Sequence, residues 1–116
     1  IGSNSAMTFI RSMLDYSGFS MDFDFILGGD MGIKSKPEPD IYMEACRQLE
    51  VDPKDAIALE DAINGIRSAH GAGMNPVMIP DIVQDTREVD SLLFGKCESL
   101  LEFAEILKSI KLDTEE

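Results

Sequence analysis

The chain has 116 residues, 44% of them hydrophobic and 28% charged, and its 22 acidic against 10 basic residues give a net charge of −12. This composition indicates one ordinary folded domain, and the acidic balance argues against nucleic acid or an anionic membrane as partner. No apolar run approaches the roughly 20 residues that span a bilayer and no signal peptide is recognisable, so we expect a cytoplasmic protein without a membrane partner.

The first half of the chain predicts a turn, a helix, a strand and a second helix. Polar residues follow Ile1 directly, as where a strand ends. Residues 8–19 carry apolar side chains at helical spacing and stop near Gly18. Residues 23–29 (FDFILGG) favour a short strand closed by glycines, and residues 36–51 favour a helix with a proline in its first turn.

The second half alternates strands and helices. Residues 56–60 (AIALE) predict a strand, and residues 61–73 a helix with Asp61 as N-cap. Residues 75–80 (NPVMIP) predict a buried strand, and residues 98–110 an amphipathic helix that packs on a sheet face. This alternation is typical of the α/β class, so we expect a Rossmann-like parallel sheet with flanking helices.

Three predicted strand ends carry polar side chains. Ser3 and Asn4 follow the first, Lys36 lies after the second, and Glu60 and Asp61 close the third. In an open parallel sheet, ligands bind outside the carboxyl ends of the strands. Buried carboxylates need a cationic partner or a metal, and hydroxyl, amide and lysine groups suit a phosphate. Together the three ends predict a phosphate and magnesium site.

Each part alone has a simpler interpretation. Ser3 and Asn4 could form an N-terminal cap, Lys36 could be a solvated loop residue, and Glu60 and Asp61 could be acids favoured by a helix dipole. Their occurrence in order, each after a strand, makes coincidence less plausible.

Two stretches carry a resemblance to a known family. Residues 36–42 (KPEPDIY) and 59–74 (LEDAINGIRSAHGAGM) resemble motifs of the haloacid dehalogenase superfamily, in its β-phosphoglucomutase and phosphoglycolate phosphatase-like branch. The resemblance covers residues 1 to about 95 and only the C-terminal half of such a protein. It implies a Mg²⁺-dependent phosphatase or phosphomutase that acts on a small phosphorylated metabolite through an aspartyl-phosphate.

The resemblance also implies roles for individual residues. Ser3 falls on the hydroxyl that contacts the transferring phosphoryl group, and Asn4 lies beside it. Lys36 falls on the lysine that neutralises the phosphate, while Glu60 and Asp61 fall on the acids that bind Mg²⁺. The expected catalytic residues are therefore Ser3, Lys36 and Asp61.

The sequence departs from the family pattern in one important respect. Family members use an Asp nucleophile in an Asp-x-Asp-Gly-Thr motif, which does not occur here, and Ala62 stands where the family often has Ser. The nucleophile strand and the cap domain that selects the substrate are likewise not recognisable. We therefore expect residues 1–116 to be the C-terminal part of a hydrolase core, inactive alone and with a gap in its sheet.

Two other interpretations stay open. A non-enzymatic α/β domain of the receiver type could bind a metal or a phosphate with the same residue types. Alternatively, a half-domain could assemble with a copy of itself, because unpaired strand edges and bare apolar faces favour association. Such a homo-oligomer would complete the interrupted sheet.

Overall fold

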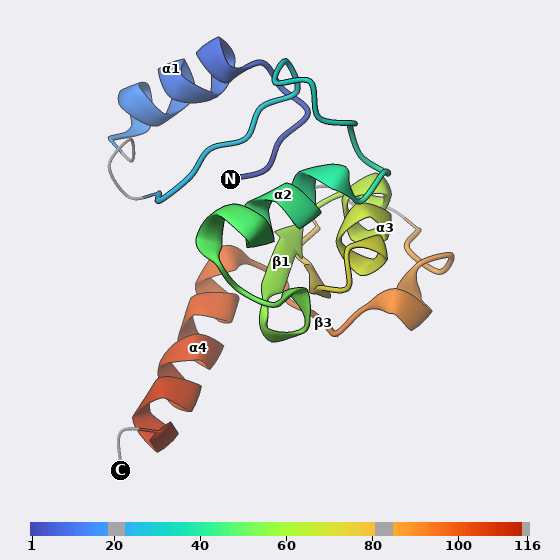
Figure 1. The fold of residues 1–116 in the computed structure, drawn as a ribbon. Coiled ribbons are helices and arrows are strands. Elements are labelled where there is room, and N and C mark those ends of the chain that lie inside the picture. Colours follow the sequence, from blue (N-terminus) through green and yellow to red (C-terminus); the bar gives the residue numbers. More distant parts are fainter. Residues whose placement is uncertain (19–22, 81–84, 115–116) are drawn as a thin grey trace.

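A computed structural model describes residues 1–18, 23–80 and 85–114 (Figure 1). The helices are α1 (Met7–Ser17), α2 (Asp40–Leu49), α3 (Ile63–Gly71) and α4 (Leu100–Thr114). The strands are β1 (Ile57–Glu60), β2 (Asn75–Met78) and β3 (Gly95–Lys96), and two short 3₁₀ helices are η1 (Pro53–Asp55) and η2 (Asp90–Leu92).

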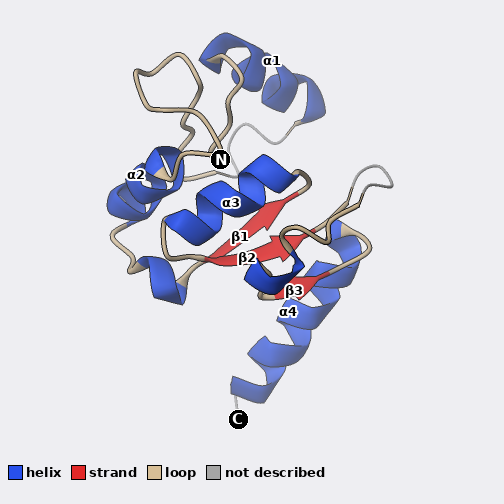
Figure 2. Cartoon of the chain, turned by 90° about the vertical axis from the view of Figure 1, so that its right-hand side faces the viewer, coloured by secondary structure: helices blue, strands red, loops and turns tan. Residues whose placement is uncertain are grey.

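The strands form a parallel sheet in the order β1-β2-β3. Glu60 of β1 lies opposite Met78 of β2, and Val77 lies opposite Gly95 of β3. Helix α3 connects β1 to β2 and packs over both strands (Figure 2). The α/β prediction with a Rossmann-like parallel sheet is therefore confirmed.

The predicted strand at residues 23–29 is reduced to a single parallel bridge between Gly2 and Leu27. The N–H of Leu27 donates to the carbonyl of Ile1 at 2.7 Å, and the N–H of Ser3 donates to Leu27 at 2.9 Å. Glycines follow Leu27 at once, and the bridge does not belong to the three-stranded sheet. Within the described residues, β1 is thus an edge strand of that sheet.

The main hydrophobic core joins α2 and α3 to β1. Its buried members are Leu27, Ile41, Tyr42, Cys46, Ala58, Ala69 and Met74. A second cluster packs Ile66 of α3 on Met78 and Val89. Because α3 contributes to both clusters, it fixes the carboxyl end of β1 against the rest of the fold.

The residues predicted to end α1 and to begin α3 can be compared with the structure. Gly18 closes α1 in the left-handed conformation at φ 79°, as predicted from its position. Asp61, however, is not the N-cap of α3, so that prediction was wrong. Ala62 takes the extended N-cap conformation and makes no side-chain capping bond. Asp61 is therefore left in the short turn between β1 and α3.

Helix α4 begins two residues after the predicted start and projects from the sheet in Figures 1 and 2. The prediction that it packs on a sheet face with its apolar side is not borne out for most of that side. Phe103 is half-buried, but five other large apolar side chains are exposed: Leu100, Leu101, Ile106, Leu107 and Ile110. No helix in the described ranges is both long and apolar enough to cross a membrane.

Candidate active site

Glu60 is a buried carboxylate at the carboxyl end of β1. Side chains along β1 alternate, so Ala58 and Glu60 share the covered face of the strand. Glu60 is only 8% exposed. Its Oε1 atom accepts hydrogen bonds from Lys36 Nζ at 2.5 Å and from the Tyr42 hydroxyl. The partner of this carboxylate in the structure is thus the Lys36 ammonium, a pairing that the sequence analysis did not predict, and the metal expected beside Glu60 remains a prediction.

Lys36 lies in the loop before α2 and connects three segments. Besides Glu60, its Nζ donates to the carbonyl of Gly2 at 2.9 Å. Its backbone N–H donates to Asn4 Oδ1 at 3.0 Å. The same ammonium lies 4.9 Å from the centre of the Tyr42 ring. Lys36 is thus held by the first strand end, by α2 and by β1.

The loop at Ser3 and Asn4 is fixed to the second strand end. The Ser3 hydroxyl accepts the N–H of Ser5 at 3.1 Å, and the N–H of Gly29 donates to the Ser5 carbonyl at 2.8 Å. A Cβ atom on Gly29 would lie 1.9 Å from the Asn4 carbonyl oxygen, so this close approach requires glycine. The Asn4 side chain orients the backbone of Lys36, while Ser3 is partly exposed beside it.

Asp61 lies next to Glu60 in sequence but in a different environment. It is exposed, and its charge acts on Tyr42. Mg²⁺ prefers oxygen ligands and is usually held by one or two carboxylates with water, which fits this pair. Across the described ranges, no three His, Cys, Asp or Glu side chains form a group that could hold a metal. The pair therefore offers a partial ligand set, with Asp61 the more accessible member.

Tyr42 comes from the first turn of α2 and is 8% exposed. Burial, and next the negative charge of Glu60, raise the pKa of its hydroxyl above the ordinary value. The hydroxyl is thus a neutral donor to the Glu60 carboxylate. Tyr42 belongs to the KPEPDIY stretch, but no role was predicted for it from the sequence. The available signal was a polar aromatic residue within a predicted helix, six positions after the lysine.

Gly65 is a second residue that the sequence analysis passed over. A Cβ atom at this position would lie 2.0 Å from Glu60 Oε2 and 2.1 Å from its carboxyl carbon. The first turns of α3 can therefore pack on the Glu60 carboxylate only because residue 65 has no side chain. Glu60 thus accepts hydrogen bonds from Lys36 and Tyr42 at Oε1, and the backbone at Gly65 packs against its carboxyl group.

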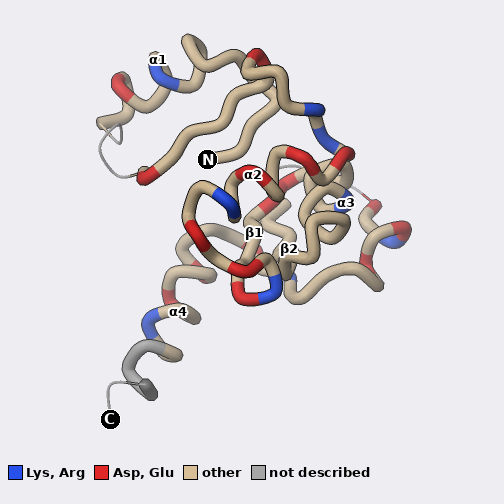
Figure 3. The backbone as a smooth tube through the Cα atoms, viewed as in Figure 1, with Lys and Arg blue, Asp and Glu red and all other residues tan. Residues whose placement is uncertain are grey.

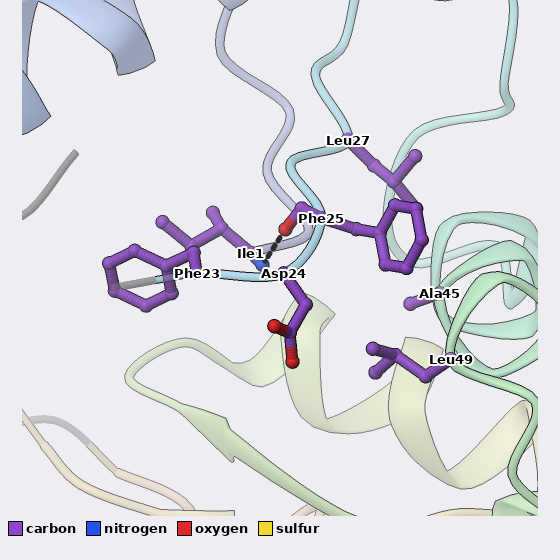
Figure 4. A pocket seen from close by; sticks show the side chains of 7 residues that line it. All are labelled: Ile1, Phe23, Asp24, Phe25, Leu27, Ala45 and Leu49. Atoms are coloured by element: carbon purple, nitrogen blue, oxygen red, sulfur yellow. Dashed lines mark hydrogen bonds between the residues drawn. The ribbon is translucent and has the colours of Figure 1, made fainter. Parts of the chain in front are cut away.

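A separate cavity of about 210 Å³ lies beside α2, and Figure 4 shows the side chains that line it. It is lined mainly by apolar side chains: Ile1, Phe23, Asp24, Phe25, Leu27, Ala45 and Leu49. None of the residues that the sequence singled out lines it. The hydrogen-bonded group around Glu60 is therefore the stronger candidate for chemistry.

Comparison with known proteins identifies the family of the chain. Residues 1–79 match the family of haloacid dehalogenase-like hydrolases. The chain belongs to this family. The resemblance in the KPEPDIY and LEDAINGI stretches is thereby confirmed, and the two motifs contribute Lys36 and Glu60, which meet in the structure.

Two curated relatives illustrate the match. Protein CbbY of Cereibacter sphaeroides is 44% identical over 85 residues, which cover 72% of this chain and 35% of CbbY. The putative phosphatase YhcW of Bacillus subtilis is 32% identical over 114 residues, which cover 97% of this chain and 50% of YhcW. The chain thus spans half or less of the length of these two relatives.

Solved structures share the fold. The crystal structure of CbbY from Rhodobacter sphaeroides in complex with phosphate has a TM-score of 0.72 at 30% identity, covering 84% of this chain and 44% of that one. A putative β-phosphoglucomutase from Thermotoga maritima has a TM-score of 0.82 at 21% identity and covers 93% of this chain and 51% of that one. The second likeness shows the fold alone.

Proposed function

We propose that this chain is the C-terminal part of a Mg²⁺-dependent phosphatase or phosphomutase that acts on a small phosphate monoester. The observation that carries the proposal is the ion pair of Lys36 and Glu60 at the carboxyl end of β1, bonded to the Gly2 carbonyl. Family membership and relatives described as phosphatases support it. Cytoplasmic location remains part of the proposal.

In this proposal Lys36 binds the phosphate of the substrate. Its ammonium is a fixed cation with a side chain 13% exposed, and two of its bonds go to Glu60 and to the Gly2 carbonyl. A preorganised charge of this kind stabilises the negative charge that develops during phosphoryl transfer. Ser3 would donate its hydroxyl to a phosphate oxygen, and Asn4 keeps the Lys36 backbone in register with that loop.

Asp61 and Glu60 would hold the metal. Bound Mg²⁺ supplies charge neutralisation and orientation of the phosphate. Asp61 would be a direct ligand because it is exposed, whereas Glu60 Oε1 already accepts two hydrogen bonds. Glu60 would then contact both the metal and the Lys36 ammonium.

The nucleophile is proposed to lie outside these residues. In the parent protein an Asp carboxylate would attack the phosphorus while the bond to the ester oxygen breaks, and that oxygen would take a proton from water. Water or a second hydroxyl would then attack the aspartyl-phosphate and release the Asp carboxylate. The present chain carries no Asp-x-Asp-Gly-Thr sequence. We therefore expect the isolated chain to turn over phosphate esters at a small fraction of the parent rate.

The test is a phosphate-release assay on a panel of small phosphate monoesters. The complete protein should release phosphate with Mg²⁺ and lose this activity with a chelator. The 116-residue chain assayed in parallel should be close to inactive. Binding of Mg²⁺ or phosphate by the complete protein without turnover would instead favour the non-enzymatic domain, and parent-like rates from the chain alone would refute the assignment of the nucleophile.

A second candidate is a homo-oligomer that covers β1. This strand is at an edge of the sheet in the described part of the chain, and its outward side chains Ile57 and Leu59 are 41% and 39% exposed. Unpaired edges with apolar side chains favour association. Light scattering of the 116-residue chain over a concentration series tests this, and a monomer at all concentrations would count against it.

A further inference from the structure

Tyr42 contacts both members of the Lys36 and Glu60 ion pair. Its hydroxyl donates to Glu60 Oε1, the same atom that accepts Lys36 Nζ at 2.5 Å. Lys36 Nζ lies over the face of the Tyr42 ring, 4.9 Å from the ring centre. One side chain therefore supplies a donor to the carboxylate and a π face to the cation.

The contacts of Tyr42 restrict the positions of both the Glu60 carboxylate and the Lys36 ammonium. Tyr42 is buried in the main core with Ile41 and Cys46, so its ring cannot move without disturbing α2. The backbone of Gly65 packs against the Glu60 carboxyl group, where an added Cβ would lie 2.0 Å from Oε2 and 2.6 Å from Oε1. The carboxylate is therefore held by two donors at Oε1 and covered by α3, and Lys36 Nζ is directed by this carboxylate and by the Gly2 carbonyl.

We propose that Tyr42 is a positioning residue for phosphoryl transfer, which fixes the Glu60 carboxylate and through it the Lys36 ammonium in the geometry that receives phosphate and metal. This inference rests on the proposed function of the same site. The hydroxyl acts on Glu60 and the ring acts on Lys36, so the two contributions can be separated by substitution. In this role Tyr42 acts through Glu60 and Lys36 and not directly on the substrate.

The substitutions are Tyr42→Phe, which keeps the ring and removes the hydroxyl, and Tyr42→Leu, which removes both. Tyr16→Phe is the matched control, because Tyr16 is 95% exposed on α1. Each variant of the complete protein is assayed for kcat and KM with a phosphate monoester. Dissociation constants for Mg²⁺ and for inorganic phosphate are measured by calorimetry, and the folded fraction is followed by urea unfolding.

For Tyr42→Phe we expect kcat to fall about 10-fold and Mg²⁺ affinity to fall severalfold, with phosphate affinity changed less than about 3-fold. A lost hydrogen bond to a charged group accounts for a change of this size. Tyr42→Leu should weaken phosphate binding as well, because Lys36 loses the ring. Tyr16→Phe should match the wild type in every measurement.

The outcomes separate this inference from the function on which it rests. If the wild-type protein shows no turnover with Mg²⁺, the proposed function fails. If, in addition, folded Tyr42→Phe binds Mg²⁺ and phosphate as tightly as the wild type does, the inference is overturned as well. If the wild type is active and folded Tyr42→Phe has the same kcat and Mg²⁺ affinity, the inference alone is overturned. If Tyr42→Leu does not fold, Tyr42→Phe decides the question alone.

Discussion

Lys36 and Glu60 lie 24 positions apart in sequence, and Lys36 Nζ is 2.5 Å from Glu60 Oε1. Both side chains are largely shielded from water, at 13% and 7% exposed. A buried pair of this kind costs desolvation on both sides, so its mutual attraction offsets that cost only while both partners are present. The loop before α2 and the end of β1 are therefore coupled through one ion pair.

Replacing one partner of the ion pair should lower the free energy of unfolding more than replacing both. Lys36→Met leaves Glu60 charged and buried, and we expect the free energy of unfolding to fall by about 3–5 kcal/mol. The double variant Lys36→Met with Glu60→Leu should recover most of that loss, because well-packed apolar side chains can replace a buried pair. Urea unfolding at pH 7 measures both.

Lys34→Met is the control for this experiment, because Lys34 lies in the same loop and is exposed. It should change the free energy of unfolding by less than about 0.5 kcal/mol. If the single variant Lys36→Met were as stable as the wild type, the ion pair would not be buried as described.

Gly65→Ala should destabilise the fold. The added Cβ would lie 2.0 Å from Glu60 Oε2, and the confined carboxylate cannot move away without losing Lys36 or Tyr42. A loss of about 1–3 kcal/mol is expected for such overpacking, and thermal unfolding measures it.

Gly71→Ala is the matched control on the same helix, since its nearest atom to a new Cβ is Pro39 Cβ at 3.4 Å. It should be neutral or slightly stabilising because alanine favours helix. Equal effects of the two substitutions would show that helix propensity, and not contact with Glu60, determines residue 65.

Ionisation of Tyr42 should be linked to unfolding at high pH. Burial and the charge of Glu60 raise its pKa in the folded state. A raised folded-state pKa stabilises the fold below the unfolded pKa of about 10, and this contribution is lost as the pH rises above that value. In Tyr16→Phe, Tyr42 is the only tyrosine left of two.

Absorbance at 295 nm of Tyr16→Phe should therefore stay flat through pH 10 and rise only when the circular dichroism reports unfolding. Tyrosinate absorbance that rises near pH 10 in a protein that is still folded would contradict the burial of Tyr42 against Glu60.

Most helices and strands were predictable from the sequence, because the spacing of apolar residues within each segment indicates its secondary structure. This spacing predicted β1, α3 and β2 in the observed order, and their alternation predicted the α/β class. The strand predicted at residues 23–29 failed, because a strand needs a partner and the structure gives Leu27 only the bridge to Gly2. The prediction that Asp61 caps α3 was wrong because the chain stays extended through Ala62, which is the N-cap residue.

The candidate site was predictable to a lesser extent. Residue types at strand ends indicated Asn4, Lys36 and Glu60, which the structure joins by hydrogen bonds. Tyr42 and Gly65 were not singled out, because their contacts depend on how α2 and α3 pack against β1. Such contacts between distant segments leave little local signal in a single sequence.

The most direct test of the magnesium and phosphate assignment is Mg²⁺ binding by Asp61→Asn in the complete protein, measured by calorimetry together with phosphate release. The control is Asp55→Asn, because Asp55 is exposed and precedes β1 at its opposite end. We predict that Asp61→Asn weakens Mg²⁺ binding at least about 10-fold, because even residues that only support metal ligands typically cost about 10- to 100-fold when replaced, and lowers activity in step, while Asp55→Asn does neither. Wild-type Mg²⁺ affinity and wild-type activity in Asp61→Asn would contradict the account.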